Sequence, residues 1–289
     1  MPSINVLEAS HYYELTPPVA DPKRPVLVFV HGWLLSRHYW QPIVQSLESK
    51  YQCLTYDARG FGDSSNSTIY ASDNSHEPRG YGLDAYAEDL KYLLENLEIE
   101  QAWIVGHSLG GSVALWAANI CPEVVQGVVC LNAGGGIYLK EEFERFRNVG
   151  KQLVKFRPNW LRHAPFLSIL FSRMMVSRPL KLKWGRQRVI DFIQADGEAA
   201  IGALLESTTE AEVHFLPQLV SQLEQPVYFI AGEKDKVMEL KYVNHLASFH
   251  QLFSSQDSNV FVISNCGHLG MVEAPEEVAS IITKVLSKY

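Results

Sequence analysis

Short apolar segments alternate with longer segments of helical periodicity along most of this chain. Apolar residues fill six short segments, which we expect to be strands: residues 26–31, 51–57, 102–106, 125–131, 226–231 and 260–264. Several are apolar nearly throughout, as expected of strands that are buried on both faces of a sheet. Helical periodicity between them predicts helices over residues 38–48, 84–97, 109–120, 241–253 and 275–286. This alternation is typical of an α/β fold with a mostly parallel sheet and helices on both faces.

One long segment breaks the alternation. Residues 135–216 contain helical patterns and no good strand. We interpret them as a helical cap, or lid, inserted between two strands of the sheet, because no linker rich in Pro, Gly or Ser separates them from the rest. The predicted organisation is an α/β core formed by residues 1–134 and 217–289, with the cap at residues 135–216.

Composition and charge narrow the class of protein. The chain has 289 residues, of which 47% are hydrophobic and 20% charged, as expected of a soluble globular protein. The net charge of −7 argues against general affinity for nucleic acid. The first residues show no signal peptide, no apolar segment is long enough to span a membrane, and the four cysteines lack metal-ligand spacing. We therefore expect a cytoplasmic protein with reduced thiols.

The strongest chemical signal is a Gly-x-Ser-x-Gly pattern. Ser108 lies between Gly106 and Gly110, directly after an apolar strand and at the start of a predicted helix. A serine in this context occupies a sharp, strained turn, and the flanking glycines avoid the clash that a Cβ would cause. The helix start also supplies a backbone N–H and a favourable dipole for a developing oxyanion. The pattern predicts that Ser108 is a nucleophile.

A serine nucleophile needs a base, and the base needs an orienting acid. Two downstream loops follow strands and carry suitable side chains: Asp235 follows the strand at 226–231, and His268 follows the strand at 260–264. Both loops lie beyond the carboxyl end of a strand, and therefore at the same sheet edge as Ser108. Glu233 is a second candidate acid, but its offset from the strand end fits less well.

Taken together, the chain resembles the α/β-hydrolase superfamily over nearly its full length. The resemblance rests on His31-Gly32-Trp33, the loop from Asp57 to Ser64, the turn at Ser108, the Gly232–Asp235 loop, and Gly267-His268 with Glu273 and Pro275 beyond. It implies a catalytic triad of Ser108, Asp235 and His268, with the oxyanion hole formed by the backbone N–H groups of Trp33 and Leu109. Family members that place the acid one strand earlier have Asp where this chain has Asn132, which favours Asp235.

Two other histidines lie close to these motifs in the sequence. We expect His31 to form hydrogen bonds with backbone near the oxyanion loop. We expect His107 to point away from the nucleophile and to serve in packing. The sequence contains no cluster with metal-ligand spacing and no dinucleotide-binding glycine pattern, so we predict no cofactor and no metal.

The predicted cap has an unusual charge. Residues 137–190 contain thirteen Lys or Arg and three Glu, a net charge of +10 in an otherwise acidic chain, and aromatic residues lie among them. One interpretation is a cap whose apolar side lines the substrate pocket and whose charges are solvated, which is the usual arrangement of amphipathic helices. The other is peripheral contact with an anionic membrane, with Lys181, Lys183, Arg186 and Arg188 as candidates to face the lipid.

These features predict a serine hydrolase that cleaves a carboxylic ester, or a related acyl bond, of a hydrophobic small molecule. The alternatives that share the triad are a carbon–carbon bond hydrolase and a cofactor-free haloperoxidase or perhydrolase. The haloperoxidase or perhydrolase interpretation is less favoured, because those enzymes usually have proline where this chain has Leu34. A receptor that hydrolyses its ligand slowly is a further alternative. The sequence does not specify the oligomeric state.

Overall fold

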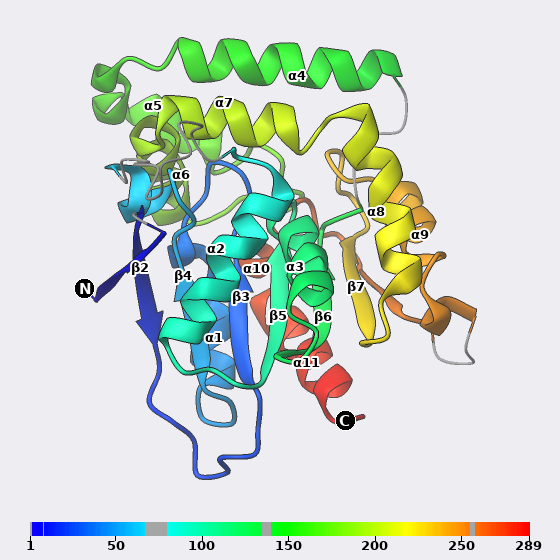
Figure 1. The fold of residues 1–289 in the computed structure, drawn as a ribbon. Coiled ribbons are helices and arrows are strands. Elements are labelled where there is room, and N and C mark those ends of the chain that lie inside the picture. The colour runs from blue at the N-terminus through cyan, green and yellow to red at the C-terminus, as the bar shows by residue number, and fades with distance from the viewer. Residues whose placement is uncertain (1, 8, 67–79, 135–139, 255–257) are drawn as a thin grey trace, which may run out of the picture.

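A computed structural model describes residues 2–7, 9–66, 80–134, 140–254 and 258–289. Eight strands form one sheet in the order β1-β2-β4-β3-β5-β6-β7-β8 (Figure 1). The strands are β1 Ser3–Val6, β2 Ala9–Leu15, β3 Val26–Val30, β4 Cys53–Tyr56, β5 Ala102–His107, β6 Val125–Leu131, β7 Val227–Gly232 and β8 Val260–Ile263. β1 and β2 pair antiparallel, β2 pairs antiparallel with β4, and every other neighbouring pair is parallel.

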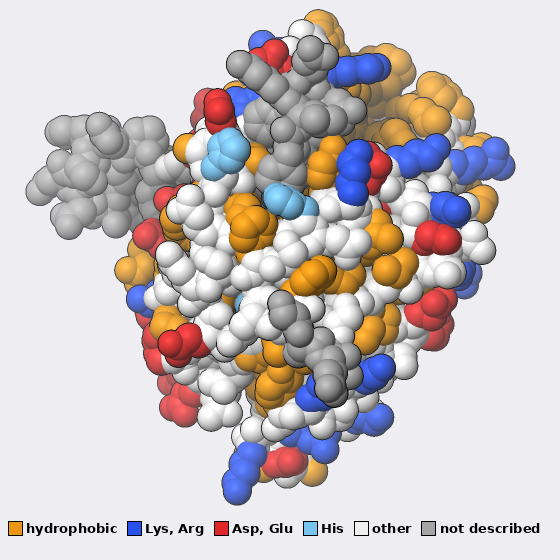
Figure 2. Space-filling view, turned by 90° about the vertical axis from the view of Figure 1, so that its right-hand side faces the viewer, with side chains coloured by type: hydrophobic (Ala, Val, Ile, Leu, Met, Phe, Trp, Pro, Cys, Tyr) orange, Lys and Arg blue, Asp and Glu red, His pale blue; other side chains and the backbone are white. Residues whose placement is uncertain are grey.

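The described part of the segment between β6 and β7 contains helices and no strand, and we call residues 140–222 the helical insertion. It comprises α4 Lys140–Lys155, η3 Asn159–His163, α5 Pro165–Phe171, α6 Leu182–Gln194, α7 Gly197–Glu206 and α8 Glu210–Gln222. α4, α5 and α7 lie above the upper end of the sheet in Figure 1. In the turned view of Figure 2, hydrophobic side chains lie beside Lys and Arg side chains in this upper part of the molecule.

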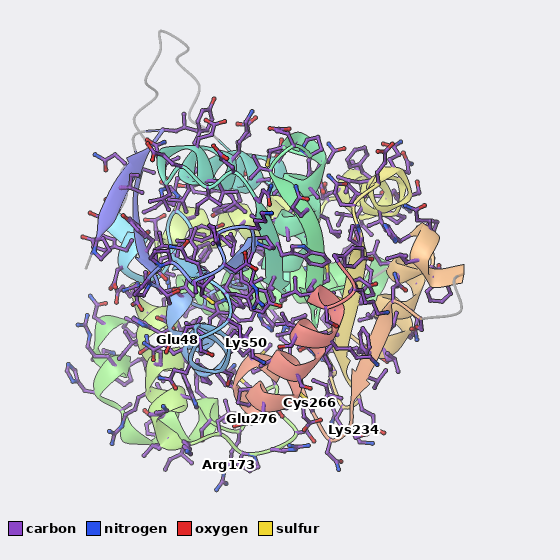
Figure 3. All side chains as sticks on the ribbon, turned by 90° about the horizontal axis from the view of Figure 1, so that it is seen from below. Glu48, Lys50, Arg173, Lys234, Cys266 and Glu276 are labelled. Atoms are coloured by element: carbon purple, nitrogen blue, oxygen red, sulfur yellow. The ribbon has the colours of Figure 1, made fainter. Side chains whose placement is uncertain are left out.

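Helices cover both faces of the sheet. α2 Leu83–Asn96, α3 Leu109–Ile120, α8 and α9 Leu240–Ala247 pack on one face. α1 Gln41–Leu47, α10 Gly270–Glu273 and α11 Pro275–Leu286 pack on the other. Seen from below in Figure 3, α11 and α3 lie on opposite sides of the sheet. The remaining short helices are η1 Arg37–Trp40, η2 Gly62–Asn66 and η4 Gln251–Ser254.

The two cores explain why the strands are apolar almost throughout. Side chains of a strand alternate between the faces of a sheet. In β3, Val28 and Val30 belong to the core under α2 and α3, whereas Leu27 and Phe29 belong to the core under α1 and α11. A strand covered by helices on both faces has no position left for a polar side chain.

The predicted α/β fold with a mostly parallel sheet and helices on both faces is confirmed, and all six predicted strands are present. β1 and β2 were not predicted from the sequence, and both are partly exposed. The helix predicted at 241–253 ends at Ala247, and a separate short helix, η4, follows. α8 continues to Gln222, beyond the predicted cap boundary at residue 216, and packs against α3 and α9. Among the described residues, no helix combines the length and apolar character needed to cross a bilayer.

Candidate active site

Ser108 lies at the carboxyl end of β5, near the middle of the sheet, and directly before α3. Its backbone has φ 52° and ψ −119°, an unusual conformation for a residue with a side chain. Its N–H donates to the carbonyl of Leu131 on β6 at 3.0 Å, and its own carbonyl accepts from the N–H of Gly111 at 2.9 Å. These backbone bonds hold the strained turn in place, which is how such strain persists in a folded protein.

The glycines of the Gly-x-Ser-x-Gly pattern are required by close backbone contacts. A Cβ on Gly106 would lie 2.1 Å from the carbonyl oxygen of Gly110. A Cβ on Gly110 would lie 2.4 Å from the carbonyl oxygen of Val30. Both distances are far below ordinary contact, so the strand-to-helix turn can be this tight only with glycine at the two positions.

Asp235 and His268 form a buried hydrogen-bonded pair. Asp235 follows β7 and His268 follows β8, and Oδ2 of Asp235 lies 2.8 Å from Nδ1 of His268. The other carboxylate oxygen of Asp235 accepts from the backbone N–H groups of Val237 and Met238, at 2.8 and 2.9 Å. Burial by itself would raise the pKa of Asp235, but His268 and the two N–H donors outweigh it and lower the pKa below its ordinary value. A carboxylate at Nδ1 orients the ring and directs Nε2 away from the pair.

Glu233, the alternative acid, is exposed and makes different contacts. Its carboxylate accepts from the backbone N–H of Asn265 at 3.0 Å and lies 3.9 Å from Nζ of Lys234. Of the two candidate carboxylates, Asp235 is therefore the one that the structure brings to His268.

The loop after β3 lies directly against Ser108. A Cβ on Gly32 would lie 3.2 Å from Cβ of Ser108, so the backbone of Gly32 and Trp33 passes beside the serine. Leu109 is the first residue of α3, and the N–H of a first helical residue has no acceptor within its own helix. Of the two predicted oxyanion donors, Leu109 thus directly follows the serine in the chain, and Trp33 directly follows the glycine that lies against it.

Comparison with known proteins adds to this geometry. The family model of the alpha/beta hydrolase fold matches residues 25–275. The chain belongs to the α/β-hydrolase family. This α/β hydrolase is 28% identical over 226 residues to a bifunctional esterase/perhydrolase of Acinetobacter calcoaceticus, a match that covers 74% of this chain and 75% of the relative.

Two further matches extend over nearly all of the α/β hydrolase. The 2-succinyl-6-hydroxy-2,4-cyclohexadiene-1-carboxylate synthase of Salmonella typhimurium is 26% identical over 285 residues, covering 92% of this chain and 95% of the relative. A thermophilic esterase from Thermogutta terrifontis superposes with a TM-score of 0.75 and 20% identity, covering 100% of this chain and 99% of that one. At that identity the structural match shows the fold.

In this α/β hydrolase, Asn132 is a site residue that the sequence analysis did not recognise. It follows β6 and its Nδ2 donates to Oδ2 of Asp235 at 2.9 Å and to the carbonyl of Gly267 at 3.1 Å. It therefore ties the loop of Asp235 to the loop of His268. The sequence does contain an indication of this role. Asn132 is the first polar residue after a predicted strand, and the carboxyl end of that strand lies at the same sheet edge as Ser108.

His107, which we expected to serve in packing, also contacts His268. Nε2 of His107 lies 2.7 Å from the carbonyl oxygen of His268, and the centroids of the two rings are 4.9 Å apart. Burial, and next the nearby His268, lower the pKa of His107 to about 3, so this ring is neutral. A neutral ring that donates from Nε2 positions the loop of His268 beside the residue that precedes Ser108.

His31 behaves as the sequence analysis expected. Its Nε2 accepts from the N–H of Ala58 at 3.0 Å, so Nδ1 carries the proton and donates to the carbonyl of Gly32 at 2.8 Å. Burial lowers the pKa of His31, which fits this neutral tautomer. The ring thus fixes the backbone immediately before Trp33.

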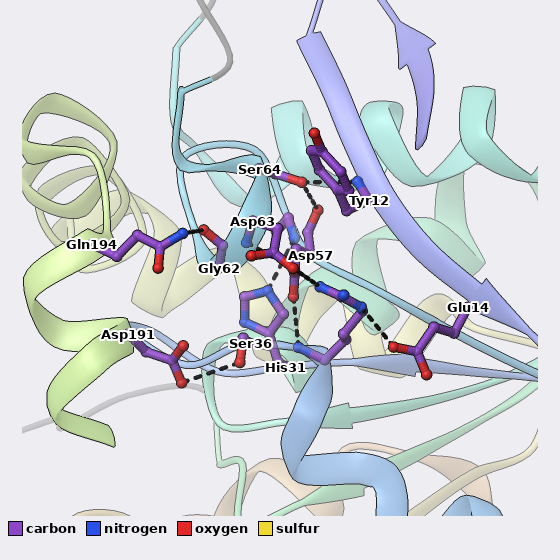
Figure 4. A network of polar contacts seen from close by, with 12 residues as sticks. Tyr12, Glu14, His31, Ser36, Asp57, Gly62, Asp63, Ser64, Asp191 and Gln194 are labelled. Carbon is purple, nitrogen blue, oxygen red and sulfur yellow. Dashed lines mark hydrogen bonds and ion pairs between the residues drawn. The ribbon is translucent and has the colours of Figure 1, made fainter. Parts of the chain in front are cut away.

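A polar network connects the loop after β3 with β2, β4 and α6 (Figure 4). Asp57 accepts from the backbone N–H of Arg37 at 2.7 Å and from that of Asp63 at 2.9 Å, and it pairs with the guanidinium of Arg37. On the other side of the loop, Ser36 donates to the buried carboxylate of Asp191 on α6 at 3.1 Å. The network therefore anchors the loop after β3 both to the sheet and to the helical insertion.

The described residues hold no group of three His, Cys, Asp or Glu side chains placed to bind a metal ion. The four cysteines are all buried and unpaired, and burial raises the pKa of Cys53 and of Cys266 to about 12. These two thiols are protonated at neutral pH and are poor nucleophiles. Ser108 is therefore a better candidate nucleophile than either of them.

Proposed function

We propose that this protein is a serine hydrolase that cleaves carboxylic esters through a covalent acyl-enzyme formed on Ser108. The observation that carries the proposal is the buried Asp235–His268 pair at the sheet edge where Ser108 occupies its strained turn. Membership of the α/β-hydrolase family and the matched esterases support it.

In this mechanism Nε2 of His268 takes the proton from Ser108 Oγ as the oxygen attacks the acyl carbon. Asp235 keeps the proton on Nδ1 and stabilises the imidazolium that forms. The backbone N–H groups of Trp33 and Leu109 stabilise the oxyanion of the tetrahedral intermediate. His268 then protonates the departing alcohol, and a water molecule, activated by the same ring, releases the acid.

The contacts of the insertion favour a hydrophobic acyl or alcohol group, and we propose that residues 135–216 act as a cap over the site. Nε1 of Trp33 donates to the carbonyl of Ala200 on α7 at 2.8 Å. A Cβ on Gly150 of α4 would lie 2.5 Å from a methyl group of Leu204 and 3.3 Å from the ring of Trp33. The insertion thus presents apolar groups to the loop that forms one side of the site.

A fluorophosphonate probe and a series of esters of increasing acyl length test the proposal together. The probe should label the native protein once, and Ser108→Ala should abolish labelling and remove roughly 10³- to 10⁶-fold of the esterase rate. Ser112→Ala, a buried serine on α3, is the matched control and should keep both. Labelling that persists in Ser108→Ala would refute the assignment of the nucleophile.

Perhydrolysis at the same site ranks second. It is supported by the match to the bifunctional esterase/perhydrolase. The backbone of the loop after β3 disfavours it. Leu34 stands where perhydrolases usually have proline, and its φ is 55°, which proline cannot adopt because its φ is held near −65°. Loops with proline at this position therefore have a different backbone. Bromination that depends on added hydrogen peroxide, at a rate comparable with ester hydrolysis, would reverse the ranking.

A further inference from the structure

The helical insertion exposes an unusual amount of apolar side chain. Seventeen large hydrophobic residues are exposed among those that the structure describes, and eleven of them lie between Val149 and Ile190. The most exposed of these eleven are Phe156 at 75%, Trp160 at 64% and Phe166 at 62%. We call the exposed residues from Arg145 to Ile190 the outer surface of the insertion. Contiguous exposed apolar side chains on this scale mark interaction surfaces in soluble proteins.

The exposed apolar residues follow the outer faces of the helices. On α4, Val149 and Leu153 are exposed, whereas Gly150 and Val154 are buried, and Phe156 is exposed directly after the helix. The helix therefore carries apolar side chains on its exposed side as well as on its buried side, whereas a helix that only covers a protein core has a polar outer side.

α5 and α6 repeat this arrangement. The exposed residues of α5 include Phe166, Ile169 and Leu170, and those of α6 include Leu182 and Ile190, with Arg186 between them one turn from each. The opposite sides of the two helices pack together, since a Cβ on Gly185 would lie 1.9 Å from a carbonyl oxygen of α5. The outer surface is thus the side of these helices that the described residues leave uncovered.

The charge of the outer surface has one sign. Residues 145–190 contain twelve Lys or Arg and no Asp or Glu. Eight of the twelve are exposed: Arg145, Lys155, Arg162, Arg173, Arg178, Lys181, Lys183 and Arg186. Arg173 lies at the edge of the molecule in Figure 3. The whole chain carries a net charge of −7, so this concentration of positive charge is local.

Arg188 does not belong to this surface, and its assignment to the lipid-facing group was wrong. It is 5% exposed, and its guanidinium donates to the backbone carbonyls of Phe171 and Met174. Burial lowers its pKa from the ordinary value. This side chain joins α6 to the segment after α5 and so helps to shape the outer surface from inside.

We infer that the outer surface of the insertion docks on an anionic lipid bilayer. Aromatic and aliphatic side chains enter the region between headgroups and acyl chains, and the surrounding Lys and Arg side chains bind the anionic headgroups. A second copy of this chain fits less well, because pairing the same surface in a symmetric dimer would bring these positive charges together. A nucleic acid would bind the charges but would leave the aliphatic side chains in water.

The docking surface is physically connected to the candidate active site. The backbone carbonyl of Met175, an exposed residue of this surface, accepts the N–H of His268 at 2.8 Å. Two N–H groups of the same segment, those of Ser177 and Arg178, donate to Glu273, which also accepts the N–H of Gly267. Docking therefore places the loop of His268 next to the lipid surface. The inference does not depend on the proposed ester hydrolysis.

Co-sedimentation of the full chain with vesicles tests the inference. We would compare vesicles of phosphatidylcholine alone with vesicles that also contain phosphatidylglycerol, at low salt and near 1 M salt, where the Debye length is about 3 Å. Ser108→Ala is used in parallel so that lipid hydrolysis cannot obscure binding. The native protein should bind the anionic vesicles at low salt, bind the neutral vesicles more weakly, and be released by high salt.

Three sets of substitutions assign the binding to this surface. Replacing Lys155, Arg173 and Arg186 with Gln should weaken anionic binding on the order of a hundredfold, since each basic residue contributes about fivefold. The control replaces Lys23, Lys50 and Lys284, exposed lysines outside the insertion, with Gln. This control loses as many positive charges as the first variant, and it should bind as the native protein does. Phe156→Ser with Trp160→Ser should also weaken binding, and circular dichroism should show that every variant is folded.

Several results would overturn the inference. Equal binding to neutral and anionic vesicles would remove the role of the charges. An equal loss of binding in the Lys155, Arg173 and Arg186 variant and in its lysine control would mean that net charge alone governs binding. A dimer in sedimentation velocity without lipid, dissociated by Phe156→Ser with Trp160→Ser, would mean that a second copy covers this surface instead.

Discussion

Oδ2 of Asp235 is shared between two partners, Nδ1 of His268 at 2.8 Å and Nδ2 of Asn132 at 2.9 Å. One carboxylate oxygen thus orients the candidate base and also receives a donor from the loop after β6. The three side chains come from loops that follow three neighbouring strands, β6, β7 and β8.

Asp235→Asn should leave the fold intact and lower kcat by about 10⁴-fold. The amide cannot hold a proton on Nδ1 as the carboxylate does, so His268 takes the wrong tautomer. Steady-state kinetics with the best ester substrate measure the loss, and circular dichroism checks the fold. Glu233→Gln is the matched control and should keep kcat near the native value. The opposite pattern would mean that Glu233 is the functional acid.

Asn132→Gly should lower kcat by roughly 10- to 100-fold and leave KM nearly unchanged, because a hydrogen bond to a buried charged group contributes about 1.5–3 kcal/mol. Glycine is the suitable replacement, since Asn132 has φ 48° and alanine would add backbone strain. Asn132→Asp should reduce kcat further, because it places a second carboxylate beside Asp235. Native kcat in Asn132→Gly would show that this side chain has no positioning role.

Gly110→Ala should strongly destabilise the protein. The added Cβ would meet the carbonyl oxygens of Val30 at 2.4 Å and of His31 at 2.5 Å, so the end of β3 would have to move. Overpacking of this kind costs about 1–3 kcal/mol or more, and we expect a lower Tm and loss of fluorophosphonate labelling.

The control for Gly110→Ala is Gly197→Ala on α7, where the nearest atom to a new Cβ is 3.5 Å away. It should preserve or slightly raise Tm, because alanine is the better helix former. Equal effects of the two substitutions on Tm would contradict the steric explanation.

Asp191→Asn should remove a pH-dependent loss of stability. Burial raises the pKa of Asp191 to about 7, from 3.8 in the unfolded chain. The folded state therefore binds the proton more tightly, and its stability falls as the pH rises from about 4 through 7. The variant should have a Tm several degrees above the native value at about pH 8, and the difference should shrink towards pH 5. A constant difference across this range, measured by thermal unfolding, would mean that Asp191 does not titrate there.

The sequence alone determined the sheet strands from β3 to β8 and the turn at Ser108. Both are local features, since a strand buried on two faces must be apolar and a strand-to-helix turn of this tightness must have glycine on either side. The shared edge of parallel strands also let the sequence select the loops of Asp235 and His268, although the choice between Asp235 and Glu233 needed the structure.

Only the tertiary structure decided the features that depend on which segments meet. β1 and β2 form strands because β1 pairs with β2 and β2 pairs with β4. No local sequence pattern indicates this pairing. Asn132 and His107 reach the loop of His268 across the sheet edge, and their residue types do not reveal it. Arg186 and Arg188 are two positions apart on one helix, yet the first is exposed and the second is buried among carbonyls, because α5 packs against only one side of α6.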